Sequence, residues 1–368
     1  MRGRVNSDRY WRRAAKGVAL AAGLVLSSAF VFAGGGQESR SIQESPSIQG
    51  SYSADDGVLR IVGTTTQASD LLRILSKGAE NVEITGLMGA GVDPHLYKPT
   101  ERDMRAMNNA DVVIYSGLHL EGQFDTVFRA LHERGVVVYA LSEPVKSGGF
   151  VIGGFDRALS KLGSDDPHFW FDPRNWELSV RGLAALLAEI DPEQAEVYRA
   201  NGETYAVQLE LLYAWANEGM RSVPEGQRYI VTSHDAFQYF GAAFGWRMAA
   251  IQGISTEDEA GVGDIQQTVD FVIDNRIPVL FIESSIPPGT IQAVIEAIRA
   301  EGEEARLGIR ELYSDAMGAP GTFGGTYVGM LAENVYTILQ SYRDAGVDVV
   351  IPEWPAGLDI SPPATLFK

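Results

Sequence analysis

The chain has 368 residues, of which 45% are hydrophobic and 21% charged, and its net charge is −18. This length predicts about two domains, and the composition excludes collagen-like and disordered chains. No Cys is present, which excludes disulfide frameworks, zinc fingers, iron–sulfur clusters, thiol nucleophiles and a lipid anchor on an N-terminal Cys. An acidic surface repels phosphate backbones, so we expect no nucleic-acid partner.

Residues 1–33 have the pattern of a secretory signal peptide. Six basic residues precede an apolar run at 18–32, and Val31 and Ala33 fit the positions of a cleavage site. The alternative is a membrane anchor, but the run is shorter than the ~20 residues of a spanning helix. We therefore expect an exported, soluble protein of net charge −23 after cleavage. Residues 34–56, rich in Gly, Ser and Gln, predict a flexible leader.

The next segment, 57–190, alternates apolar strands with amphipathic helices. Strands are expected at 58–66, 81–89, 111–117 and 136–142. Helical spacing follows three of them, at 68–79, 101–110 and 124–135. This alternation predicts βαβ units and a parallel sheet, which would form a first lobe.

Residues 191–221 then predict one long helix. No Pro follows Pro192, and Asp191 can cap the helix with Pro192 at its first position. A helix of about 28 residues is roughly 42 Å long at 1.5 Å per residue. Gly202 is its weak point, because Gly costs ~1 kcal/mol relative to Ala inside a helix. A stiff connector between two lobes is expected, whereas most domains are joined by flexible loops.

The last segment, 222–368, repeats the alternation. Strand candidates lie at 228–234, 246–253, 278–285 and 305–315, with helical stretches such as 264–275 and 289–302. The predicted fold class is therefore α/β, with two Rossmann-like βαβ lobes of parallel sheet joined by a long backbone helix. Phosphate-binding loops, HExxH and GxSxG are all absent from the sequence, and the Gly-rich stretch 318–325 reads as a loop.

Three of the five histidines lie in short polar segments that follow strands or form loops, namely His95, His168 and His234. Asp315 holds the equivalent place after a late strand. Ligands of open parallel sheets bind beyond the carboxyl ends of the strands, so these residues could face a cleft. Each alone could also be a solvated or capping residue. Together, three histidines and one carboxylate make a plausible metal site, and the residues alone do not prove it.

The other two histidines are assigned structural roles. His132 lies in the last turn of a predicted helix, where a partial positive charge suits the helix dipole. His119, in GLHLEG, follows a strand and is a weaker ligand candidate.

Six motifs give a resemblance to a known family. VDPHLYKPTERD, GLHLEG, DPHFWFDPRNW, TSHDAFQYFG, FIESSIPP and YSDAMG occur in this order. They resemble the TroA/ZnuA-type solute-binding proteins of zinc and manganese ABC transporters, over about 58–345. The resemblance implies a periplasmic monomer that is not an enzyme, captures a divalent metal and delivers it to a membrane permease with its cytoplasmic ATPase. It also implies that His95, His168, His234 and Asp315 are the metal ligands.

The implied ligands divide equally between the lobes, with His95 and His168 in the first and His234 and Asp315 in the second. Three imidazoles and one carboxylate favour Zn²⁺ and tolerate Mn²⁺ or Fe²⁺. Residues 143–167 lack the His-rich loop of many zinc-specific members. Manganese-specific members typically carry Glu where this chain has His234. The resemblance therefore assigns neither a dedicated zinc nor a dedicated manganese subtype.

Ligating imidazoles need an acceptor on the second ring nitrogen. Asp93, Asp166 and Glu283 are the acidic neighbours that could serve, although loop or turn roles are commoner for such residues.

Two other functions share the same site. A zinc hydrolase would need an open coordination position and a general base, for which four protein ligands leave little room. An exported adhesin or metal buffer would bind metal without docking to a permease.

Overall fold

The computed structural model describes residues 57–153, 165–257, 259–364 and 366. The expected signal peptide and flexible leader, 1–56, lie outside the described residues. Within the described ranges, no helix combines the length and the apolar character needed to cross a membrane.

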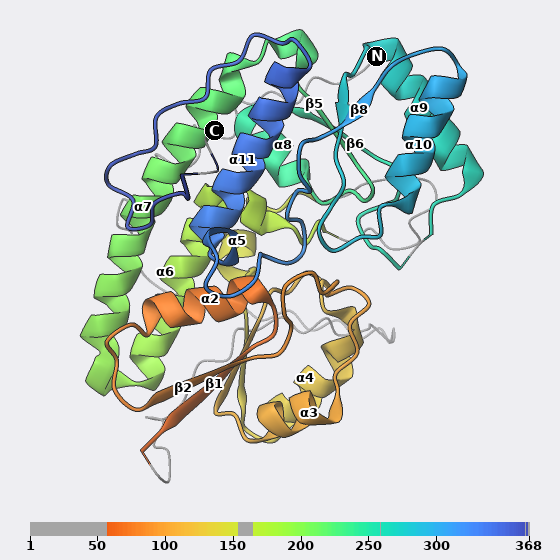
Figure 1. The fold of residues 1–368 in the computed structure, drawn as a ribbon. Coiled ribbons are helices and arrows are strands. Elements are labelled where there is room, and N and C mark those ends of the chain that lie inside the picture. Colours follow the sequence, from red (N-terminus) through yellow and green to blue (C-terminus); the bar gives the residue numbers. More distant parts are fainter. Residues whose placement is uncertain (1–56, 154–164, 258, 365, 367–368) are drawn as a thin grey trace, which may run out of the picture. The chain divides into compact units, whose positions relative to one another are not determined.

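The first lobe contains a four-stranded parallel sheet, as predicted (Figure 1). Its strands, in the order β2-β1-β3-β4, are β1 (Leu59–Gly63), β2 (Val82–Gly86), β3 (Val112–Tyr115) and β4 (Val137–Ala140). The helices are α2 (Thr66–Leu75), α3 (Glu101–Asn108), α4 (Asp125–Glu133), α5 (Glu143–Gly148) and α6 (Pro173–Ile190). A core that includes Val62, Met107, Val113 and Phe124 packs against one face of the sheet.

The first strand is shorter than predicted because α2 begins early. The Thr65 hydroxyl accepts a hydrogen bond from Ala68 N, which caps α2 and places Thr66 in its first turn. Further along α2, the buried Asp70 accepts a hydrogen bond of 2.9 Å from Tyr327 N, at the start of α11 (Tyr327–Asp344). The N-terminal half of α2 is thus tied to the second lobe.

The long connecting helix is confirmed as α7 (Ala195–Ser222), which has 28 residues (Figure 1). It begins three residues later than predicted, because Pro192–Gln194 form a separate 3₁₀ turn. The predicted cap is wrong: the Asp191 carboxylate accepts a hydrogen bond from Tyr198 OH at 2.8 Å and does not cap the turn. Gly202 has a packing role, since a Cβ there would lie 3.0 Å from Ala184 Cβ on α6.

The second lobe contains two parallel strand pairs. β5 (Tyr229–Thr232) pairs with β6 (Arg247–Ala250), and β7 (Val279–Leu280) pairs with β8 (Arg306–Leu307). A hydrogen bond from Phe281 N to Val231 O, 2.9 Å long, joins the two pairs. Besides α11, the helices are α8 (Gln238–Phe244), α9 (Val262–Asn275) and α10 (Gly289–Ala300).

Three features of this half of the chain differ from the sequence prediction. The strand expected at 278–285 is reduced to the two residues of β7. The strand expected at 305–315 is reduced to β8, because Ile309 N donates to the Ser341 hydroxyl on α11 and the chain leaves the ladder there. Only an isolated bridge between Leu312 and Glu283 resumes the pairing among the described residues. The sequence pattern does not predict the 18-residue helix α11, because this helix is buried on most faces and has no polar stripe to mark its period.

Candidate metal centre

Four side chains meet between the two lobes. His95, His168, His234 and Asp315 each offer one ligand atom within 4.8 Å of the others, and all four are buried. His95 Nε2 lies 3.3 Å from His168 Nε2. The two carboxylate oxygens of Asp315 lie 3.2 Å from His168 Nε2 and 3.3 Å from His234 Nε2. The structure therefore brings together all four side chains selected from the sequence.

The positions follow from the ends of the parallel strands. His95 lies in the loop after β2, and His234 comes two residues after β5. Asp315 follows β8 and the isolated bridge at Leu312. His168 immediately precedes the 3₁₀ turn Phe169–Phe171, in which all three aromatic side chains are buried. The Trp170 ring lies 5.3 Å from the His168 ring, centre to centre, in an edge-on arrangement.

Buried carboxylates lie behind two of the imidazoles. Asp166 Oδ1 is 2.8 Å from His168 Nδ1 and accepts a further bond from His168 N at 2.9 Å. Glu283 Oε2 is 2.6 Å from His234 Nδ1, and its Oε1 accepts from His234 N at 2.9 Å. An acceptor at Nδ1 favours the tautomer that leaves the Nε2 lone pair for a metal.

Asp93 differs from the other two acids. Its Oδ1 accepts a hydrogen bond from His95 N at 2.9 Å, and its Oδ2 accepts one from Thr256 Oγ1 at 2.6 Å. The suggested contact with the His95 ring is therefore wrong, and the loop role is correct for Asp93. A loop of the second lobe, through Thr256, fixes the segment that carries His95.

The charges of the centre are strongly coupled. Burial lowers the pKa of His95 to about 3. Burial also acts to lower the pKa of His168, but the hydrogen bond with Asp166 and the negative charge of the neighbouring Asp315 outweigh it and raise that pKa to about 9. Glu283 and Asp315 likewise hold the pKa of His234 well above its usual range despite burial. The nearby imidazolium groups overcome burial to hold the pKa of Asp315 well below its usual range.

This arrangement suits a divalent cation. The two oxygens of Asp315 are buried, and no hydrogen bond of good geometry reaches them from the described residues. The imidazolium groups of His168 and His234 balance this buried carboxylate, and a divalent cation that displaces their protons would take over that role. Three imidazole nitrogens and one carboxylate oxygen are also a sufficient set for tetrahedral Zn²⁺.

The remaining histidines lie outside this cluster. The His119 side chain is 77% exposed, and its Nδ1 lies 3.4 Å from Asp125 Oδ2. His119 has a positive φ of 63°, in a turn held by the buried Glu121, which accepts bonds from Ser116 N at 2.8 Å and Thr64 Oγ1 at 2.7 Å. His132 is exposed in the last turn of α4, as expected.

Sequence analysis missed residues that act across the lobes. Tyr239 of α8 donates a hydrogen bond of 2.9 Å to Asp166 O and accepts one of 3.0 Å from Ile152 N. Tyr239 and Thr256 thus each support, from the opposite lobe, a segment that carries one of the clustered histidines. No local motif marks such residues, because their partners are distant in sequence.

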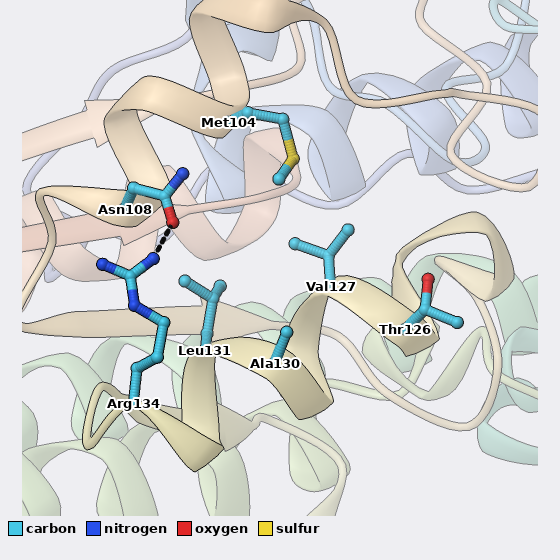
Figure 2. A pocket seen from close by; sticks show the side chains of 7 residues that line it. All are labelled: Met104, Asn108, Thr126, Val127, Ala130, Leu131 and Arg134. Carbon is cyan, nitrogen blue, oxygen red and sulfur yellow. Dashed lines mark hydrogen bonds between the residues drawn. The ribbon is translucent and has the colours of Figure 1, made fainter.

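A separate hollow of about 170 Å³ lies between α3 and α4 (Figure 2). Its lining is mostly apolar, and a hydrogen bond from Arg134 to Asn108 lies at its edge. The lining residues are Met104, Asn108, Thr126, Val127, Ala130, Leu131 and Arg134. None of the four clustered side chains takes part in it.

Comparisons with known proteins agree with this geometry. Residues 61–341 match the family model ZnuA, described as the periplasmic component A of the zinc-uptake complex. The manganese-binding lipoprotein MntA of Bacillus subtilis is 36% identical over 78% of this chain and 91% of its own. The zinc-binding protein TroA of Treponema pallidum is 38% identical over 78% of this chain and 89% of its own. A solved structure of TroA superimposes with a TM-score of 0.71 at 37% identity, covering 77% of this chain and 99% of TroA.

Proposed function

Because the chain belongs to the ZnuA family of solute-binding proteins of metal ABC transporters, we propose that it binds one divalent metal ion through His95, His168, His234 and Asp315. It is a binding protein and not an enzyme, and the metal is its cargo. It delivers this cargo to the membrane permease of the transporter, which works with a cytoplasmic ATPase.

One observation carries the proposal. Three buried imidazoles and one buried carboxylate converge from the two lobes, within 4.8 Å of one another. The acids behind His168 and His234 support their role as Nε2 ligands. A hydrolase is disfavoured, because four protein ligands already satisfy a tetrahedral ion and leave no position for an activated water.

We propose Zn²⁺ as the more tightly bound ion, with Mn²⁺ also accommodated and Fe²⁺ tolerated. Imidazole suits zinc and iron, and divalent affinities generally rise from manganese towards copper. The relatives include both a protein named for manganese and a protein named for zinc. The preference for zinc depends on the imidazole at position 234, since a carboxylate there would leave only two imidazoles.

The organisation proposed for the whole chain has five parts. A signal peptide at 1–33 and a leader at 34–56 precede the first lobe at 57–190, the connecting helix at 191–221 and the second lobe at 222–368. Cleavage after Ala33 would release a soluble, monomeric protein into the periplasm. N-terminal sequencing of exported material should begin at Gly34 or within a few residues, and an intact Met1 would contradict export by this route.

Metal titration of His168→Ala tests the binding site. A ligand of the native state stabilises it by RT ln(1 + [L]/Kd), about 4 kcal/mol at a thousandfold excess over Kd. Zinc should therefore raise the melting temperature of the natural protein, and His168→Ala should lose most of this rise while remaining folded without metal. His132→Ala is the matched control and should behave like the natural protein. Equal losses in both variants would overturn the ligand assignment.

Delivery needs its own test, since a metal buffer or adhesin would bind metal equally well. The purified protein should support ATP-dependent zinc uptake into vesicles that contain the permease and its ATPase. The loaded protein should also bind these vesicles, and His168→Ala should support no uptake. Tight zinc binding without docking or uptake would favour the buffer function.

A further inference from the structure

We propose that Thr66 and Gln67, at the start of α2, are positioning residues that fix the orientation of Asp315 and help the site to accept Mn²⁺ beside Zn²⁺. The inference rests on the proposed function, because it assumes that Asp315 is a metal ligand. Two residues of the first lobe thus help to set the orientation of Asp315, which belongs to the second lobe.

A short network of hydrogen bonds joins this pair to the Asp315 segment. Gln67 Nε2 donates to Asp315 O at 3.0 Å. The Thr66 hydroxyl accepts from Met317 N at 2.9 Å and donates to Gln67 Oε1 at 2.9 Å. Gln67 is only 1% exposed, so these bonds are formed out of water. The first turn of α2 therefore holds the main chain on both sides of Ala316.

The second lobe fixes the residues that precede Asp315. Asn334 on α11 accepts from Tyr313 N and donates to Tyr313 O, both at 2.8 Å. At Asp315 itself, the second lobe contributes a longer bond of 3.3 Å from Asp315 N to Ser285 Oγ. The Ser314 hydroxyl also pairs with Ser285 Oγ at 2.7 Å. The dependence on α2 is therefore confined to residues 315–317, whose shortest main-chain hydrogen bonds are those to Gln67 and Thr66. Loss of this pair would let the Asp315 main chain shift while Tyr313 stays in place.

The orientation of Asp315 affects the two metals differently. Its two oxygens face different imidazoles, at 3.2 Å from His168 Nε2 and 3.3 Å from His234 Nε2, so both are turned towards the centre of the cluster. Zn²⁺ completes a tetrahedral set with one of these oxygens. Mn²⁺ binds nitrogen more weakly and prefers oxygen ligands, so it gains more from a carboxylate that presents both. A rotated Asp315 should therefore cost manganese affinity more than zinc affinity.

The test compares zinc and manganese affinities in Gln67→Met and Thr66→Val by competition titration. Both substitutions keep the side-chain volume approximately and remove the hydrogen bonds. Loss of support for a ligand typically lowers metal affinity about 10–100-fold, and we expect a loss in this range for Mn²⁺ but one of about threefold or less for Zn²⁺. Thr66→Ser keeps the hydroxyl and should retain the natural ratio of the two affinities.

Asn201→Ala is the matched control for general loosening of α2. Asn201 Nδ2 donates to Leu75 O at 2.8 Å and Lys77 O at 2.9 Å, at the opposite end of the helix. Its removal should leave the zinc-to-manganese ratio unchanged. A rise of the ratio in Asn201→Ala as large as in Thr66→Val would assign the effect to the helix as a whole and overturn the inference.

The inference and the proposed function fail in different ways. Metal binding that survives in His168→Ala would overturn the proposed function. A second case is that His168→Ala loses metal binding but Thr66→Val keeps the natural zinc-to-manganese affinity ratio, either because neither affinity changes or because both fall equally. In that case only the positioning role is refuted. Thermal unfolding without metal identifies a variant that does not fold, and Thr66→Val decides the question alone if Gln67→Met is such a variant.

Discussion

Glu283→Gln tests whether the acid behind an imidazole controls metal affinity. In the natural protein, Glu283 Oε2 lies 2.6 Å from His234 Nδ1, and Oε1 accepts from His234 N at 2.9 Å. A glutamine retains the acceptor for His234 N but places an NH₂ donor against Nδ1. To avoid two facing donors, the ring must lose its proton from Nδ1 and carry it on Nε2. That tautomer has no lone pair directed at the metal.

The size of the effect follows from the nature of this contact. Glu283 Oε2 and His234 Nδ1 form a buried ion-pair contact without hydrogen-bond geometry, so the change of tautomer sets the effect. Removing the acid behind a ligating imidazole typically lowers metal affinity about 10–100-fold, and we expect a loss of zinc affinity in this range. The metal-free variant should stay folded, because the substitution preserves volume and the bond from His234 N.

Competition titration against a chelator measures this affinity, and Asp93→Asn supplies the control. Asp93 accepts from the His95 main chain and from Thr256 Oγ1, so an asparagine can retain an acceptor without changing an imidazole tautomer. Zinc affinity should fall much less in Asp93→Asn than in Glu283→Gln. Affinities for Glu283→Gln within twofold of the natural protein would refute the tautomer argument, and equal losses in the two variants would show that any acid near the site has the same effect.

Four further outcomes are expected. Burial raises the pKa of Asp70 from 3.8 to about 6, so proton binding to Asp70 stabilises the fold below pH 4, and this contribution disappears as the pH rises through 6. In urea unfolding, Asp70→Asn should therefore be more stable than the natural protein by about 1–3 kcal/mol at pH 7.5 and about equally stable at pH 4. A variant that is less stable at pH 7.5 than at pH 4, relative to the natural protein, would contradict this assignment. Because the pKa of His168 is raised to about 9, zinc must displace its proton, and calorimetry in buffers of different ionisation enthalpy should detect proton release at pH 7.5, with affinity still rising towards pH 9. His234→Glu should lower the zinc-to-manganese affinity ratio in competition titrations, and an unchanged ratio would show that cavity geometry dominates over the donor type. Gly202→Leu should destabilise the metal-free protein by about 1–3 kcal/mol in thermal unfolding, because a Cβ at Gly202 already lies 3.0 Å from Ala184 Cβ; no loss would mean that α6 and α7 separate easily.

The sequence predicted the architecture well where the pattern is local. Amphipathic helices and apolar strands have periods that can be read from short windows, which is why the parallel sheet of the first lobe and helix α7 were predictable. The meeting of His95, His168, His234 and Asp315 was also predictable, because motifs place them beyond strands or in loops. Their role as metal ligands remains a prediction for the titrations above.

The errors arose where distant segments decide the local structure. The strand ending in β8 is short because Ser341, on α11, takes the amide of Ile309. Asp191 does not cap its turn because Tyr198, one helical turn into α7, donates to it. The contacts of Thr66 and Gln67 with the Asp315 segment could not be predicted for the same reason, since their partners are about 250 positions away in the sequence. Such pairings depend on the tertiary fold, which no window of sequence contains.

The edge-on contact between Trp170 and His168 gives the protein an internal optical reporter. An excited indole loses its fluorescence to an adjacent protonated imidazole, which accepts an electron, and the ring centres here are 5.3 Å apart. With its pKa raised to about 9, His168 carries a proton at neutral pH in the metal-free protein and should quench Trp170. An arriving Zn²⁺ removes that proton and does not itself quench an indole, so each zinc-binding event should brighten this tryptophan. The emission of Trp170, isolated by subtracting that of Trp170→Phe, therefore follows cargo loading in real time without a dye.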